Sequence, residues 1–278
     1  MKILAVSGGI DSMVMLHLFH GDKDVIVAHF DHGIRSSSKD DADFVQKTAE
    51  KYGLECIVKR EELGEDCSEA LARERRYAFL KELAQKHNAK IYTAHHQDDL
   101  IETIAINLYR GTGWRGLAPF QDADIERPLL EWPKSKIYRY ATENQVIFRQ
   151  DQSNTDDKYL RNRLRLQLRD LTAVQKTELW DLYQKQRQLG SDIFQLGSEI
   201  IKSISNDNEF ERQIFCELDD TTAFELLRQL LEQHQHFLTY PQLKLALDAI
   251  RTYHKGKKFN LPQDKFLEFS RKHCKILS

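Results

Sequence analysis

Residues 3–19, ILAVSGGIDSMVMLHLF, constrain the fold of this chain more than any other stretch. The apolar residues 3–6 predict a short buried strand, and Ser7-Gly8-Gly9 predicts a turn directly after it. Asp11 and Ser12 then open an apolar segment long enough for a buried helix. A strand, a glycine-containing polar loop and a helix predict a phosphate site, because free backbone N–H groups and the helix dipole attract anions.

The side chains of this loop strengthen the prediction. Ser7 and Ser12 can donate hydroxyl hydrogen bonds to phosphate, and Asp11 can hold a magnesium ion that neutralises it. Two glycines alone would also suit an ordinary turn between a strand and a helix. The loop lacks the lysine that ordinary P-loop sequences carry, so an ordinary P-loop NTPase is not indicated.

The rest of the chain predicts an α/β protein with a parallel twisted sheet and helices on both faces, similar to a Rossmann fold. A long linking helical segment and a small, mainly helical C-terminal domain follow. The expected domains are residues 1–167, 168–205 and 206–278, and the linking segment is one long helix or two divided near Gly190 or Gly197. Strands are expected at residues 3–6, 24–30, 55–58, 89–94 and 146–151, and helices at residues 42–52, 68–87, 100–109 and 135–144.

Polar side chains follow two further strands, where ligands bind in open parallel sheets. The sequence HFDHGIR occupies residues 29–35, and HHQDD occupies residues 95–99. Asp99 and Glu102 lie three residues apart on one helical face, where two carboxylates can bind magnesium or an ammonium group. Acidic residues at a helix start also serve as caps, which leaves a structural role for Asp98 and Asp99 open.

Basic residues are concentrated in parts of an otherwise acidic chain. Residues 251–278 hold eight Lys or Arg against two Asp or Glu, although the formal net charge of the chain is -2. Such blocks suit a polyanion, while solvated helix faces are the plain alternative. Residues 110–117, RGTGWRGL, predict a flexible basic loop over the site, and residues 254–258 predict a basic loop.

Other observations limit the class of protein. No apolar run approaches the roughly 20 residues needed to span a bilayer, and strand-like sequence begins at the N-terminus, so we expect a cytoplasmic protein without membrane association. The four cysteines are too scattered for a Cys-x-x-Cys metal or redox site.

Seven segments together resemble the bacterial tRNA(Ile)-lysidine synthetases, which are N-type ATP pyrophosphatases of the PP-loop superfamily, in a short form. The resemblance covers roughly the first 165 residues, and Asp31 departs from the asparagine that is frequent in the family. The segments are SGGIDS at 7–12, HFDHGIR at 29–35, ALARERRY at 70–77, TAHHQDDLIET at 93–103, RGTGWRGL at 110–117, RPLL at 127–130 and DQSNTDDKYLRNRLR at 151–165.

The resemblance implies a ligase that uses ATP with Mg²⁺ and free L-lysine on an isoleucine tRNA with a CAU anticodon. ATP would adenylate the C2 oxygen of the wobble cytidine, and lysine would then displace AMP. Whether the protein forms a homodimer stays open. The implied catalytic residues are Asp11, Asp98, Asp99, Glu102 and Arg110. The implied ATP or pyrophosphate site is Ser7, Gly8, Gly9, Ile10, Asp11, Ser12, His29, His32 and Arg35. Lysine would contact Asp99 and Glu102, magnesium Asp11 and Asp98, and tRNA Arg73, Arg76, Arg115, Arg161, Arg163, Arg165, Lys255, Lys257 and Lys258.

Two alternatives remain at this point. A tRNA thiolase of the same superfamily would insert sulfur instead of lysine, and such enzymes generally need a cysteine pair or cluster ligands. A regulatory module would bind ATP without turning it over. Incubation with ATP, tRNA and lysine separates these classes, since only a ligase makes AMP and pyrophosphate that depend on both other substrates.

Overall fold

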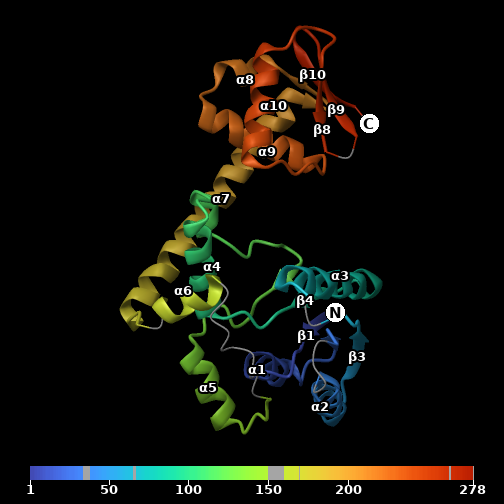
Figure 1. Ribbon diagram of the computed structural model, residues 1–278, viewed down its shortest axis with the longest axis vertical. Helices are drawn as coiled ribbons and strands as arrows, with labels where there is room; N and C mark the ends of the chain where they lie inside the picture. The colour runs from blue at the N-terminus through green and yellow to red at the C-terminus, as the bar shows by residue number, and fades with distance from the viewer. Residues whose placement is uncertain (34–37, 65–66, 150–159, 169, 263, 278) are drawn as a thin grey trace. The chain divides into compact units, whose positions relative to one another are not determined.

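The computed structural model describes residues 1–33, 38–64, 67–149, 160–168, 170–262 and 264–277 (Figure 1). The chain forms two compact units, Met1–Gln186 and Arg187–Ser278. The division falls inside the helix α7 (Ala173–Ile204). The three-part division expected from the sequence, with limits at 167 and 205, stays a prediction.

The first unit contains a five-stranded parallel sheet in the order β3-β2-β1-β4-β5. Its alternating side chains fill two apolar layers. Leu4 packs with Val14 and Val45 on one face, and Ile3 packs with Leu80 on the other. The predicted α/β class is therefore confirmed. The strands are β1 (Lys2–Ala5), β2 (Val25–Asp31), β3 (Glu55–Arg60), β4 (Lys90–Tyr92) and β5 (Ile125–Glu126).

Helices cover both faces of this sheet (Figure 1). The layer with Leu4 includes α1, α2 and α5, whereas α3 packs on the face with Ile3. The Ser68 hydroxyl accepts a hydrogen bond of 3.2 Å from the backbone N–H of Leu71 and caps α3, as its sequence predicts. The helices are α1 (Ile10–Phe19), α2 (Ser38–Lys51), α3 (Glu69–His87), α4 (Gln97–Tyr109) and α5 (Lys134–Glu143).

One predicted strand of this sheet is wrong. The fifth strand is β5, and the described part of residues 146–151 forms only an isolated parallel bridge between Gly9 and Arg149. The backbone N–H of Arg149 donates to the carbonyl of Gly8 at 2.9 Å. This segment therefore pairs with the glycine loop instead of with the edge of the sheet.

A second group of helices packs beside the sheet within the first unit. Leu100, Ile104 and Tyr183 form a buried cluster that joins α4 to the first part of α7. The helix α7 runs without a break through Gly190 and Gly197, which decides between the one helix and the two that the sequence allowed. The short 3-10 helix η1 (Trp114–Leu117) and α6 (Leu160–Leu168) complete this part of the unit.

The second unit combines helices with a sheet. Two helices of the expected mainly helical domain are α9 (Asp220–Gln233) and α10 (Tyr240–Thr252), and a short helix that was not predicted, α8 (Gln213–Glu217), precedes them. An antiparallel sheet in the order β6-β7-β10-β9-β8, which the sequence analysis did not predict, packs its apolar side chains against them. Part of the basic C-terminal block therefore lies in strands. These are β6 (Ser205–Asn206), β7 (Glu209–Glu211), β8 (Lys258–Leu261), β9 (Lys265–Phe269) and β10 (His273–Leu277).

Within the described ranges, no helix is both long enough and apolar enough to cross a membrane.

Candidate active site

The glycine loop connects β1 to α1, where the sequence predicts a phosphate site. Gly8 adopts a φ of 91°, a conformation that residues with a side chain rarely accept. The Ser12 hydroxyl donates to the carbonyl of Gly9 at 2.9 Å and accepts from the backbone N–H of Ser7 at 3.1 Å. Ser12 is buried and braces the loop, while Ser7 is exposed. Ile10 begins α1 and is part of the apolar core.

The strand β4 neighbours β1, and the helix α4 that follows β4 begins with a capping box. The backbone N–H of His96 donates to Asp99 Oδ2 at 3.0 Å, and that of Asp98 donates to His96 Nδ1 at 3.2 Å. The capping role that the sequence left open is therefore real for Asp99. Its side chain is still 28% exposed, and Glu102 on the next turn is buried.

The imidazole of His96 lies between the two predicted groups of acidic residues. Its Nε2 atom is 3.7 Å from Asp11 Oδ1 and 3.6 Å from Asp99 Oδ2, and its Nδ1 atom is 3.8 Å from Asp98 Oδ2. Asp11 is in the first turn of α1, and the other two aspartates are in the first turn of α4. The structure therefore brings the glycine loop and the HHQDD segment to one place.

Two lysines that sequence reasoning missed contact two of these aspartates, Asp11 and Asp98. Lys134 Nζ lies 2.5 Å from Asp11 Oδ1, and the backbone N–H of Lys134 donates to Asp98 Oδ2 at 2.9 Å. The ammonium of Lys176, from α7, donates to Asp98 Oδ1. Burial disfavours ionisation of Asp98, but these hydrogen bonds and the Lys176 charge outweigh it and lower the pKa of the carboxyl.

The helices α1, α4 and α5 begin near one another at this edge of the sheet. Asp11, Asp98 and Lys134 lie in the first turns of α1, α4 and α5, respectively, and contact one another through the ion pair and the hydrogen bond just described. The N-terminal end of a helix carries a partial positive charge and unpaired N–H groups. Together with the two lysines, these helix ends make a site that favours anions.

The last residues of β2 have mainly internal contacts. His29 is buried, and its Nδ1 atom lies 2.8 Å from the carbonyl oxygen of Val6. Asp31, the residue that departs from the family pattern, accepts from Gly33 N and from Arg60, at 2.9 and 3.0 Å. These contacts position the end of β2.

Histidines at the ends of β2 and β4 lie near the arginines of α3. Burial, followed by the charge of Arg76, lowers the pKa of His32. Burial, followed by the charges of Arg127, Arg73 and Arg76, lowers the pKa of His95 to about 3, so the imidazole is neutral at physiological pH. The charges of Arg73 and Arg76 on α3 therefore influence the histidines at this edge of the sheet.

Arg127 and Phe120 are further features that the sequence analysis did not select. Phe120 has a φ of 64°, which is unusual for an aromatic residue, and its carbonyl accepts from Arg127 Nη1 at 3.0 Å. The Arg127 guanidinium lies 4.7 Å from the centre of the Phe120 ring, and the His95 ring lies 5.0 Å from that ring. Arg127 begins the RPLL segment, and this segment was the sequence signal that could have identified it.

Other predicted site residues lie elsewhere. Arg110 ends α4, about 18 Å along the helix from its first turn, so the structure does not bring it to the acidic cluster. The predicted loop at 110–117 packs against α4 through Asn107, whose side chain donates to the carbonyl of Gly116 at 3.1 Å. Arg115 and Arg163 are exposed. Arg35 and the side chains of Arg161 and Arg165 lie outside the described residues.

The predicted lysines of the second unit differ from one another. Lys255 and Lys257 are exposed in the turn before β8. Lys258 is within β8, directly opposite Glu268 of β9, so a carboxylate faces it across the sheet. The first two therefore suit a phosphate contact better than Lys258 does.

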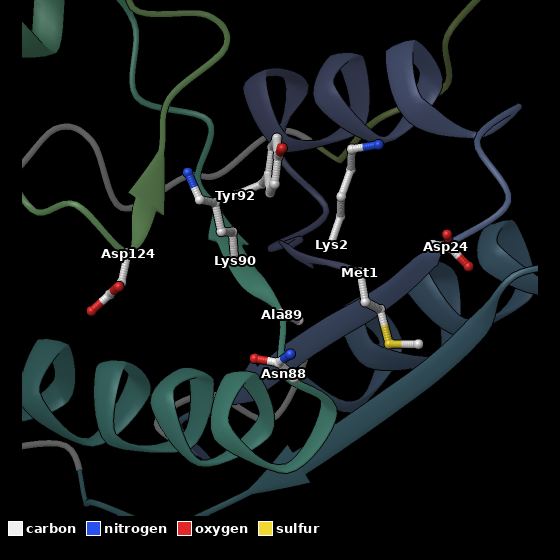
Figure 2. A pocket seen from close by; sticks show the side chains of 8 residues that line it. All are labelled: Met1, Lys2, Asp24, Asn88, Ala89, Lys90, Tyr92 and Asp124. Carbon is white, nitrogen blue, oxygen red and sulfur yellow. The ribbon is translucent and has the colours of Figure 1, made fainter.

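A hollow of about 420 Å³ lies at the other edge of the parallel sheet. Figure 2 shows lining side chains at the amino ends of β1 and β4, away from the glycine loop. Lys2 donates to Asp22 at 2.7 Å, and Lys90 donates to Glu126 at 2.6 Å. The starts of α1, α4 and α5 lie at the opposite, carboxyl edge, so this hollow lacks the helix dipoles that favour anions there.

Comparison with known proteins identifies the family. Residues 2–172 match the sequence profile of the PP-loop domain. The chain belongs to the PP-loop domain family. This PP-loop chain also has curated relatives that match beyond the domain, and it spans about half of their length.

Two relatives illustrate the extent of the match. The tRNA(Ile)-lysidine synthase of Exiguobacterium sibiricum is 38% identical over 179 residues, which cover 62% of this chain and 43% of the relative. That of Clostridium acetobutylicum is 30% identical over 293 residues, which cover 94% of this chain and 62% of the relative. The similarity thus continues into the second unit.

A solved structure supports the fold. The U34-tRNA thiolase NcsA from Methanococcus maripaludis superposes with a TM-score of 0.56 at 16% sequence identity, and the match covers 68% of this chain and 70% of that chain. At this identity the similarity concerns the fold alone.

Proposed function

We propose that this protein forms lysidine in an isoleucine tRNA with a CAU anticodon. The C2 oxygen of the wobble cytidine attacks the α-phosphorus of ATP, and pyrophosphate leaves with the electrons of the broken P–O bond. The ε-amino nitrogen of free lysine then bonds to C2 of the cytidine, and AMP leaves with the C2 oxygen.

The observation that carries the proposal is the position of His96 between Asp11 and Asp99. A ligase that handles ATP and then an amine needs a phosphate site beside an acidic site. The loop residues Ser7, Gly8 and Gly9 would bind the departing pyrophosphate, whose negative charge grows in the transition state. The similarity to tRNA(Ile)-lysidine synthases over most of the chain supports this choice of substrates.

Asp99 and Glu102 would bind the lysine co-substrate. The two carboxyl groups are on adjacent turns of one face of α4, and Glu102 is shielded from solvent. An ammonium group that enters this shielded place gains more from a carboxylate than it would in water. The neutral His95 lies beside the arginines of α3, where RNA phosphate is the anion we expect.

Asp11 would hold the magnesium ion of Mg-ATP. No cluster of three or more potential metal-binding side chains occurs among the described residues, but Mg²⁺ commonly uses one or two carboxylates and the substrate phosphates. Asp11 fits this pattern, with a side chain 30% exposed beside the glycine loop. Asp98 fits it less well, because Lys176 and the backbone of Lys134 contact its two oxygens. When bound, the ion neutralises phosphate charge.

Two of the four cysteines are poor candidates for the chemistry of the thiolase alternative. Cys56 lies on β3, and burial raises the pKa of its thiol to about 11. Cys274 lies in the core of the second unit, and burial raises the pKa of its thiol to about 12. Both thiols are therefore protonated and poor nucleophiles at neutral pH.

The test is the dependence of product formation on each substrate. The purified chain is incubated with Mg-ATP, the tRNA transcript and lysine, and AMP and pyrophosphate are measured with each component omitted in turn. We expect full turnover only with all three, and none with a transcript whose wobble cytidine is replaced by uridine. Tight ATP binding without products in the complete mixture would refute the enzyme, and sulfur transfer in its place would support the thiolase.

A further inference from the structure

Lys134 occupies an unusual position for a cation. It is the first residue of α5, where the helix dipole disfavours positive charge. Its backbone N–H is anchored on Asp98, and its side chain reaches Asp11, 123 positions away in the sequence. The ammonium is therefore held beside the glycine loop against the local preference of its own helix.

The geometry leaves the ammonium able to contact a ligand. The Lys134 side chain is 33% exposed, and its Nζ atom lies 5.6 Å from the centre of the Tyr138 ring, one turn along α5. An ammonium group has three N–H donors, and the Asp11 contact uses one of them. Two donors remain for phosphate oxygens without loss of the ion pair.

The glycine loop itself offers no cation. Residues 7–12 contain no lysine or arginine, although a departing pyrophosphate gains negative charge as the P–O bond breaks. A lysine that contacts Asp11 at the start of α1 is well placed to supply this charge. Lys176 is less suitable, because it contacts Asp98 on the neighbouring helix.

We infer that Lys134 is a catalytic residue that binds the pyrophosphate portion of ATP. It donates to the β- and γ-phosphate oxygens while Asp11 orients its ammonium group. This inference rests on the proposed adenylation, because it assumes that pyrophosphate is the leaving group. It assigns to the first residue of α5 the cation that ordinary P-loops carry within the loop.

The test compares binding of two product anions to the full chain. Titration calorimetry measures pyrophosphate with Mg²⁺ and, separately, AMP, for the wild type, Lys134→Met, Lys134→Arg and Lys136→Met. Lys136 is the matched control, because it lies on the same helix with its ammonium 4.0 Å from the centre of the Trp132 ring.

We expect Lys134→Met to weaken pyrophosphate binding by about tenfold or more while AMP binding changes by less than about twofold. The Lys134→Arg variant should retain most of the affinity, and Lys136→Met should match the wild type. Equal weakening of both anions would show a structural role only, and unchanged pyrophosphate binding by Lys134→Met would also overturn the inference. This assay needs neither tRNA nor lysine. It therefore tests the role of Lys134 even if the protein does not form lysidine.

Discussion

His96 Nε2 lies 3.7 Å from Asp11 Oδ1, and this contact joins the start of α4 to the start of α1. The two residues come from loops after neighbouring parallel strands, β4 and β1. Chemistry on ATP and chemistry on a second substrate can therefore share one place at the carboxyl edge of the sheet.

Replacement of Asp11 should stop adenylation. We expect Asp11→Ala to lower the rate of AMP formation by at least about a hundredfold, because the site loses the carboxylate that contacts Lys134 and is proposed to hold magnesium. Asp22→Asn is the control, since Asp22 pairs with Lys2 at the other edge of the sheet. Normal AMP release by Asp11→Ala would refute the role of the loop.

Replacement of Glu102 should affect lysine more than ATP. We expect Glu102→Ala to raise the lysine concentration for half-maximal turnover by about tenfold or more, because the ammonium loses a shielded carboxylate partner. The same kinetics with ATP varied should change far less. If ATP use alone suffers, the Asp99 and Glu102 pair binds metal instead of lysine.

Loss of the Lys176 ammonium should destabilise the first unit at neutral pH. The pKa of Asp98 is lowered in the fold, so its ionised form contributes stability above the usual pKa of 3.8, and this contribution disappears as the pH falls through the lowered value. We expect Lys176→Met to lower the free energy of unfolding by about 1–2 kcal/mol at pH 7. Denaturant titrations should show this difference shrinking below about pH 4; a constant difference down to pH 2 would contradict the ion-pair account.

The salt dependence of tRNA binding should identify the cations of the second unit. We expect the double variant Lys255→Gln, Lys257→Gln to weaken tRNA binding and to reduce the slope of log K against log salt by about one to two. Lys258→Gln is the matched control, because Glu268 faces Lys258 across the sheet. An unchanged slope in the double variant would show that Lys255 and Lys257 do not contact tRNA phosphates.

Local patterns predicted the elements that depend on neighbouring residues. The strand, loop and helix of residues 3–19 and the cap at Ser68 follow from periodicity and hydrogen-bonding chemistry within a few positions. The two residues of β5 give no such pattern, so the sequence analysis placed the fifth strand at residues 146–151 instead. In the second unit, β8 alternates lysine and asparagine with apolar residues, and the charge concealed this strand pattern.

The part of the site that consists of motif residues could be predicted from the sequence. Asp11, Asp98 and Asp99 follow strands whose carboxyl ends meet, so their proximity follows from the parallel sheet. Lys134 and Lys176 were missed because their partners are 123 and 78 positions away in the sequence. No local pattern encodes such contacts, since they depend on how the helices pack.

The most direct measurement of the central claim is the mass of the tRNA nucleosides after reaction. The full chain is incubated with Mg-ATP, the isoleucine tRNA transcript and isotopically labelled lysine, and the digested nucleosides are analysed by mass spectrometry. The account predicts one labelled cytidine derivative, located at the wobble position and absent when ATP is omitted. Consumption of ATP with an unmodified wobble cytidine, or a sulfur-containing nucleoside there, would contradict it.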